Sequence, residues 1–204
     1  PGVVSLFFEN QFYATDEEYL IAIAEAMRYE YEAIAAAGAF VQLDCPDLAM
    51  GRHTAYAGMD IAGFRRRAAL NIEALNHAVR NIPAEQLRMH VCWGNWEGPH
   101  EHDVPLTSIL PILYQTKAGA LTIEFANPRH AHEYDAIRKA GWPKDMILIP
   151  GVIESTSNFV EHPEVVARRI AEAVSVVGDR ERVIASTDCG FGTFAGREWV
   201  AGSV

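Results

Sequence analysis

The sequence predicts an α/β fold in which parallel strands alternate with helices to form a (β/α)8 TIM barrel. Short apolar runs rich in β-branched residues alternate with longer amphipathic stretches, as parallel strands joined by helical crossovers require. Polar residues suited to chemistry stand where the strands end, which is the face on which barrel enzymes carry their sites. An open doubly wound sheet has the same rhythm, but the sequence contains neither G-x-G-x-x-G nor G-x-x-x-x-G-K-[ST]. The barrel is therefore the expected architecture.

Strands are expected where an apolar run is short and is bounded by polar or turn-forming residues. In order, they are residues 3–8, 40–43, 87–92, 120–125, 146–153 and 183–187. The helices between them are expected over residues 17–37, 61–80, 106–117, a short stretch after Pro128, and 163–177. The first helix follows Thr15, a good N-cap residue, and ends before Gly38, while Pro163 suits the first turn of the last helix.

Residues 1–204 are expected to form a single barrel domain that is incomplete. The six expected strands are two short of eight, and such barrels typically need about 250 residues. The chain also begins at Pro1 without an initiator Met, and no helical pattern follows the last strand. We expect the first two strand–helix units and the closing helix to be missing.

The composition argues against several classes of function. There are 27 acidic residues against 17 Lys and Arg, so no nucleic-acid partner is expected, because that would need clustered basic charge. No apolar run is long enough to cross a bilayer and no secretory leader opens the chain, so no membrane partner is expected and the cytoplasm is the default location. Three scattered cysteines indicate buried side chains, metal ligands or nucleophiles rather than a disulfide scaffold. A homo-oligomer is compatible with the sequence.

Four residues that zinc accepts as ligands stand at the ends of three expected strands. His90 and Cys92 are two apart on one strand, so their side chains face the same way. Glu124 ends the next strand, and Cys189 follows the last one. Taken singly, each has an ordinary alternative as a core histidine, a small buried hydrophobe or a carboxylate that caps a loop. Their gathering at strand ends favours a metal site.

Several short blocks of the sequence occur together in one known family. They are P-G-V-V-S-L at 1–6, F-V-Q-L-D-C-P at 40–46, H-V-C at 90–92, L-T-I-E at 121–124, P-G-V-I at 150–153 and S-T-D-C-G at 186–190. In content and in order they resemble the catalytic barrel of cobalamin-independent methionine synthase and its relatives, over nearly the whole chain. The resemblance implies that Zn²⁺ is bound by His90, Cys92, Glu124 and Cys189 and that the strands are the third to eighth of the barrel.

The resemblance also implies a reaction. Zinc with two thiolates and one carboxylate carries a formal charge of about −1, which suits activation of a thiol better than activation of water. We therefore expect an S-alkyltransferase in which a substrate thiol becomes a zinc-bound thiolate and attacks an electrophilic carbon. In the family the usual thiol is homocysteine and the usual donor is a methyltetrahydrofolate. The expected partners are thus a small-molecule thiol and an alkyl donor.

Two aspartates are candidate catalytic residues. Asp44 matches the family's aspartate that grips the amino group of the substrate, although a strand-end Asp that forms a turn fits equally well. Asp188, beside Cys189, could support the ligands from behind, as could Asn95. Cys45 stands where methionine synthases have Glu, which loosens the link to homocysteine.

The loop at 93–103 departs from the methionine synthases and leaves other interpretations open. His100 and His102 are compatible with a second metal, with a lining of the barrel mouth or with solvated side chains. His130 and His132, two residues apart at an expected helix start where they would not share a face, leave the same choice. Arg129 suits a sulfonate, which would favour the opening of an epoxide by a thiol, as in epoxyalkane:coenzyme M transferase. A barrel with a purely structural zinc and a metal-free barrel related to the decarboxylases of the superfamily are the remaining alternatives.

Overall fold

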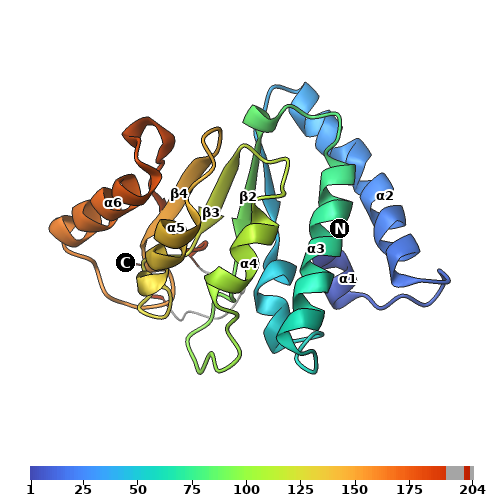
Figure 1. Cartoon of the computed structure of the whole chain (residues 1–204), viewed down its shortest axis with the longest axis horizontal. Coiled ribbons are helices and arrows are strands. Elements are labelled where there is room, and N and C mark those ends of the chain that lie inside the picture. The colour runs from blue at the N-terminus through green and yellow to red at the C-terminus, as the bar shows by residue number, and fades with distance from the viewer. Residues whose placement is uncertain (192–199, 203–204) are drawn as a thin grey trace.

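The structure, a computed structural model, describes residues 1–191 and 200–202 of the chain. At its centre is a sheet of five parallel strands in the order β1-β2-β3-β4-β5 (Figure 1). The strands are β1 (Val41–Asp44), β2 (Leu87–Val91), β3 (Ala120–Ile123), β4 (Ile147–Ile153) and β5 (Ser186–Thr187). Each strand lies beside the next one along the chain, whereas a doubly wound sheet would reverse its order partway. The described residues therefore form a curled α/β half-barrel, which confirms the expected winding but not the closure of a complete barrel.

Helices cover one face of this sheet. The α-helices are α1 (Gly2–Phe7), α2 (Asp16–Ala36), α3 (Ile61–Ala78), α4 (Leu106–Leu113), α5 (Tyr134–Ala140) and α6 (Pro163–Val177). The short 3-10 helices are η1 (Pro46–Leu48), η2 (Met50–His53), η3 (Ala84–Gln86), η4 (Ala131–Glu133) and η5 (Arg180–Arg182). In Figure 1, α3, α4 and α5 lie over the sheet, and α2 packs on the outer side of α3. Within the described residues, no helix combines the length and the apolar character that a membrane span needs.

The long helices have local causes that the sequence already indicates. At the start of α2, the Thr15 hydroxyl accepts a hydrogen bond from the Glu18 backbone N–H at 3.1 Å. Helix α6 begins with Pro163 and ends before Gly178, whose φ of 78° places it in the left-handed region that glycine adopts without strain. Helix α4 ends at Leu113, one turn earlier than expected.

One expected strand is a helix. The apolar run 3–8 predicts a strand, and this prediction is wrong, because Gly2–Phe7 form α1. Six residues are too few for the spacing of apolar side chains to separate a strand from a helix. Leu6 packs into the main core, and a Cβ on Gly2 would lie 2.0 Å from Asp47 Oδ2, so tertiary contacts decide the conformation over β propensity. The described residues thus contain five strands rather than six, and the segment that resembles the family's third strand is not a strand.

Alternation along the strands separates an apolar core from a polar concave face. In β1, Val41 and Leu43 are buried while Gln42 and Asp44 are exposed, because successive side chains point to opposite faces of a sheet. The buried set faces the helices and joins one large cluster that includes Phe64 of α3. The opposite set faces the concave side, where polar residues gather toward the carboxyl ends of the strands.

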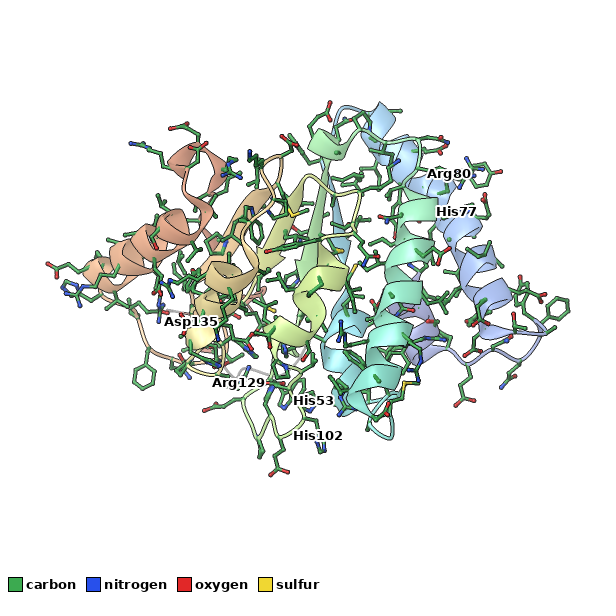
Figure 2. The ribbon with its side chains drawn as sticks, viewed as in Figure 1. His53, His77, Arg80, His102, Arg129 and Asp135 are labelled. Carbon is green, nitrogen blue, oxygen red and sulfur yellow. The ribbon has the colours of Figure 1, made fainter. Side chains whose placement is uncertain are left out.

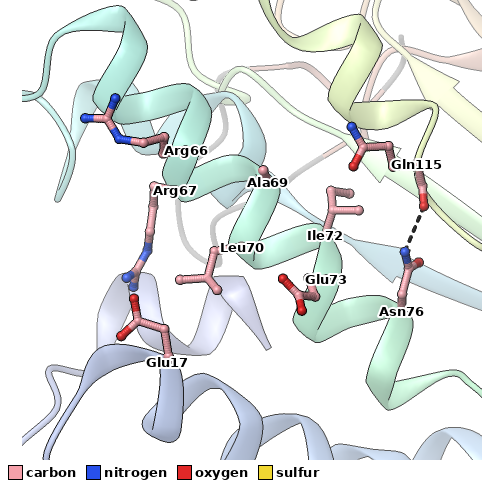
Figure 3. A pocket seen from close by; sticks show the side chains of 9 residues that line it. All are labelled: Glu17, Arg66, Arg67, Ala69, Leu70, Ile72, Glu73, Asn76 and Gln115. Carbon is pink, nitrogen blue, oxygen red and sulfur yellow. Dashed lines mark hydrogen bonds between the residues drawn. The ribbon is translucent and has the colours of Figure 1, made fainter.

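A hollow of about 740 Å³ lies on the helical side of the molecule, between α2, α3 and the end of α4 (Figure 3). Its walls include Glu17 of α2 and Glu73 of α3, and Asn76 Nδ2 donates a hydrogen bond to the Gln115 carbonyl at 2.8 Å across one side. Neither His nor Cys lines it. The residues that carry chemistry lie at the strand ends instead.

Candidate metal centre

The pairing register of the strands places the candidate ligands together. Asp44 pairs with His90, and His90 pairs with Thr122, so these three form a row across β1, β2 and β3. Because side chains alternate, Cys92 lies on the same face as His90, and Glu124 on the same face as Thr122. The residues after β5 come to the same edge, since parallel strands end on one side of a sheet.

Three of the four candidate ligands form a compact group, and the fourth borders it. The Cys92 and Cys189 sulfurs are 3.4 Å apart, and Cys189 Sγ lies 3.6 Å from His90 Nε2 and 3.6 Å from Glu124 Oε1. The donor atoms of His90, Cys92 and Cys189 all lie within 4.8 Å of one another, and all four side chains are buried. Tetrahedral zinc would separate two sulfurs by about 3.8 Å, and a sulfur from a nitrogen or oxygen by roughly 3.6 Å. His90, Cys92 and Cys189 therefore fit zinc in both chemistry and spacing, and Glu124, whose Oε1 lies 3.6 Å from the Cys189 sulfur, supplies a fourth donor of suitable chemistry at their border.

The acidic groups of this cluster restrain each other's ionisation. A hydrogen bond from Cys189, opposed by burial, lowers the pKa of the Cys92 thiol, while the same pairing and burial raise the pKa of Cys189. Burial and the nearby Cys92 raise the pKa of Glu124 to about 8. A divalent cation held among them would favour all three ionised forms at once.

Asp44 fixes the orientation of the His90 ring. Its Oδ1 lies 2.8 Å from His90 Nδ1, so Nε2 faces the Cys189 sulfur and the Asp188 carbonyl oxygen, which is 3.2 Å away. Burial lowers the pKa of His90, but the hydrogen bond and the charge of Asp44 outweigh it, so the pKa is raised. A carboxylate behind a metal-ligating histidine has this geometry. The Asp44 side chain is 65 % exposed, so a substrate could also reach it.

Asp188 ties two ligand-bearing loops together. Its Oδ1 accepts hydrogen bonds from the backbone N–H groups of Phe125 (3.0 Å) and Ala126 (2.9 Å), and its Oδ2 accepts one from Asn127 (2.7 Å). A Cβ on Gly151 would lie 1.9 Å from Oδ1, so β4 can pass this close only because it has no side chain there. Asp188 thus joins the loop after Glu124 to the loop that carries Cys189.

Other residues singled out in the sequence lie around this centre. Asn95 Nδ2 donates to the Gly190 carbonyl at 2.7 Å, and its Oδ1 accepts from Ser155 Oγ at 3.0 Å, so Asn95 braces the loop beside Cys189. Cys45 is buried in the main core, with its sulfur 3.7 Å from the Leu43 carbonyl oxygen. A hollow of about 210 Å³ opens on the concave side, lined by Gln42, His90, Thr122, Ser186, Thr187, Asp188, Cys189 and Gly190.

A cluster around Asp103 was missed at the sequence level. Asp103 Oδ1 lies 2.7 Å from His53 Nε2 and 3.1 Å from His100 Nδ1, and Oδ2 lies 3.2 Å from His130 Nε2. Burial acts to raise the pKa of Asp103, but the hydrogen bonds to these three histidines outweigh burial. The net result is a pKa well below the ordinary value of an aspartate. His130 is buried, while His102 is exposed. The spacing of His100 and Asp103 was the one available signal, because His53 and His130 come from distant loops.

Comparison with known proteins places the chain in a family. The family described as "Cobalamin-independent synthase, Catalytic domain" matches residues 10–204. A methionine synthase from Saccharolobus islandicus is 25% identical over 191 residues, covering 93% of this chain and 49% of the relative. The 2-hydroxypropyl-CoM lyase of Xanthobacter autotrophicus is 26% identical over 144 residues, covering 58% of this chain and 38% of the relative.

A solved structure agrees on the fold. The B12-independent methionine synthase from a Shewanella species, in complex with selenomethionine, aligns with a TM-score of 0.66 at 19% sequence identity, covering 91% of this chain and 52% of that one. The chain therefore spans about half the length of the methionine synthases that it matches. Since the family match takes in nearly all of the sequence, this chain belongs to the family of the cobalamin-independent synthase catalytic domain.

Proposed function

We propose that this chain is the catalytic part of a zinc-dependent S-alkyltransferase, with Zn²⁺ held by His90, Cys92, Glu124 and Cys189. The observation that carries the proposal is the convergence of two thiols, an imidazole and a buried carboxylate at one point. Zinc bound by these residues would lower the pKa of a substrate thiol while leaving its sulfur nucleophilic. Family membership supports alkyl transfer to a thiol as the reaction type.

The residues around the four proposed ligands hold these ligands in position. Asp44 holds the His90 ring, and Asp188 holds the loops that carry Glu124 and Cys189. Glu124 Oε1 accepts the Trp93 backbone N–H at 3.1 Å, which keeps that carboxylate on the edge of the sulfur pair. These contacts hold the donors in place before any substrate arrives, so little reorganisation is needed on binding.

The donor set separates this function from two others. Structural zinc sites are usually built from Cys and His alone, whereas this one includes a carboxylate that a substrate could replace. Hydrolytic zinc sites carry neutral imidazoles and generate hydroxide, whereas two thiolates and a carboxylate give a net charge of about −1. A thiol is the substrate that such a site activates best.

Homocysteine with a methyltetrahydrofolate is the leading substrate pair, by analogy with the methionine synthases. The second candidate is opening of an epoxide by a thiol, and two observations favour it. Asp44, the expected grip for an amino group, is engaged by His90, and a 2-hydroxypropyl-CoM lyase is among the relatives. Because the chain spans about half of the methionine synthases that it matches, the substrates of the whole protein are proposals.

Metal analysis and paired activity assays test the proposal. We expect about one tightly held zinc at the cysteine centre, lost in Cys92→Ser and in Cys189→Ser. Cys45→Ala is the matched control, since that thiol lies in the core, and it should keep the zinc. Methylation of homocysteine would support the first substrate pair, and consumption of epoxypropane with coenzyme M the second. Zinc content that is unchanged in both serine variants would refute the centre.

A further inference from the structure

The Asp103 carboxylate contacts basic side chains from three loops at the mouth of the half-barrel. His53 follows β1 at the end of η2, His100 belongs to the loop after β2, and His130 and Arg129 follow β3. The His53 and His100 nitrogens both face Oδ1, while His130 and Arg129 face Oδ2. Figure 2 shows His53, His102 and Arg129 at the same end of the molecule. None of these residues belongs to the cysteine centre.

Both ring nitrogens of His100 face oxygen atoms that accept hydrogen bonds. Nε2 lies 3.3 Å from the Trp96 carbonyl oxygen, and the Trp96 ring stacks on His100 with centroids 4.0 Å apart. Nδ1 lies 3.1 Å from Asp103 Oδ1. A neutral imidazole carries one N–H, so it can donate to only one of these two oxygens. When Nε2 donates to the Trp96 carbonyl, the Nδ1 lone pair faces Asp103 Oδ1, and a metal cation between these two atoms satisfies both.

We propose that His53 Nε2, His100 Nδ1 and Asp103 Oδ1 form a second metal site, which takes a divalent transition metal of the zinc class. The three donor atoms lie within 4.8 Å of one another, and the side chains of His53, His100 and Asp103 are only 10%, 1% and 16% exposed. Two imidazoles and one carboxylate are a donor set that zinc uses where it keeps an open position. Zinc would separate a nitrogen from an oxygen by about 3.4 Å, so the present separations of 2.7 and 3.1 Å need to widen by about 0.7 and about 0.3 Å.

The other Asp103 oxygen has a different role. Arg129 Nε lies 3.9 Å from Oδ2 and His130 Nε2 lies 3.2 Å from it, so these two groups orient the carboxylate and leave Oδ1 to the metal. Their positive charge lowers the affinity for a cation, so this site should bind zinc more weakly than the cysteine centre does. The open position would accept water or an oxygen atom of a small-molecule ligand.

Cobalt titration separates the two sites, because thiolate ligands give intense near-ultraviolet charge-transfer bands that a nitrogen and oxygen site lacks. In Cys92→Ser/Cys189→Ser we expect one equivalent of Co²⁺ to bind with weak visible bands only. His100→Ala and His53→Ala, added to that background, should each raise the Kd at least tenfold. His132→Ala is the matched control, since His132 is exposed on η4, and it should leave the Kd unchanged.

A second measurement does not depend on the serine background. The chain with all its cysteines should bind two equivalents of zinc, and both His53→Ala and His100→Gln should bind one, with folding checked by circular dichroism. One equivalent in the unaltered chain, or titrations that do not change when His53 or His100 is replaced, would mean that a proton bridges His100 and Asp103, and would overturn the proposal. The cysteine centre is unaffected by that outcome, so the two proposals stand or fall separately.

Discussion

At the scale of single residues, the same side chain can serve a metal or a substrate, and geometry distinguishes them. Asp44 is the clearest case, because the register of β1 and β2 sets it beside His90 and its Oδ1 lies 2.8 Å from Nδ1. A carboxylate used in this way supports metal binding, whereas a carboxylate that grips a substrate amino group affects substrate binding alone. The two roles predict different results for one substitution.

Asp44→Ala should weaken zinc binding by about 10–100-fold, because His90 loses the partner that fixes its ring and raises its basicity. Competition with a chromogenic chelator measures the affinity. Gln42→Ala is the control, since Gln42 is exposed on the same face of β1, two residues earlier. Unchanged zinc affinity with a raised KM for an amino thiol would instead identify Asp44 as a substrate grip.

Glu154 lies directly after β4, and we expect its carboxylate to make the free energy of unfolding depend on pH in the acid range. Burial acts to raise its pKa, but hydrogen bonds to Thr156 and Asn127 outweigh this, so the pKa is lowered from the ordinary 4.5. A group with a lowered folded-state pKa contributes stability above its unfolded value, and the contribution is lost as the pH falls through the folded value. The difference in free energy of unfolding between the unaltered chain and Glu154→Gln should therefore be constant from pH 6 to pH 7 and shrink below about pH 4.5. Urea denaturation across this range measures it, and a difference that does not vary with pH would refute the assignment.

At the scale of elements, the sequence was informative where an apolar run has a single interpretation. The strand ends that carry His90, Cys92 and Glu124 could be predicted, because alternation and parallel pairing fix which side chains share a face. The conformation of residues 3–8 could not be predicted from the sequence, because it depends on contacts with η1 and with the core. The Asp103 cluster also escaped prediction, because it joins loops after three different strands and sequence spacing carries no information on how such loops fold.

The close approach of β4 to Asp188 makes Gly151 a sensitive position. Gly151→Ala would bring a Cβ to 1.9 Å from Asp188 Oδ1, so the carboxylate must move and loosen the backbone N–H groups that it holds. We expect a loss of about 1–3 kcal/mol in the free energy of unfolding, together with weaker zinc binding. Gly58→Ala is the control, since nothing lies within 4 Å of a Cβ there. Equal stability of the two variants in urea denaturation would show that Asp188 can be displaced freely.

At the scale of the whole molecule, the candidate metal centre brings together the ends of β2 and β5, two strands that are not neighbours in the sheet. Cys92 and Cys189 are 97 residues apart in the sequence and their sulfurs are 3.4 Å apart, while β2 and β5 are separated in the sheet by β3 and β4. A metal that binds both would therefore restrain the curl of the sheet as well as the site. Metal binding and global stability should be coupled.

Removal of metal should accordingly destabilise the entire fold. A ligand at 100 times its Kd adds about 2.7 kcal/mol of stability to the folded state that binds it. For a chain of this size, removal of that ligand by a chelator corresponds to a fall of about 5–10 °C in Tm. Differential scanning calorimetry with and without EDTA measures the shift. In Cys92→Ser the chelator should have a much smaller effect, because the ion that links β2 to β5 is already lost, while Cys45→Ala should respond like the unaltered chain. An equal shift in Cys92→Ser would mean that the metal acts on stability through residues other than the cysteine centre.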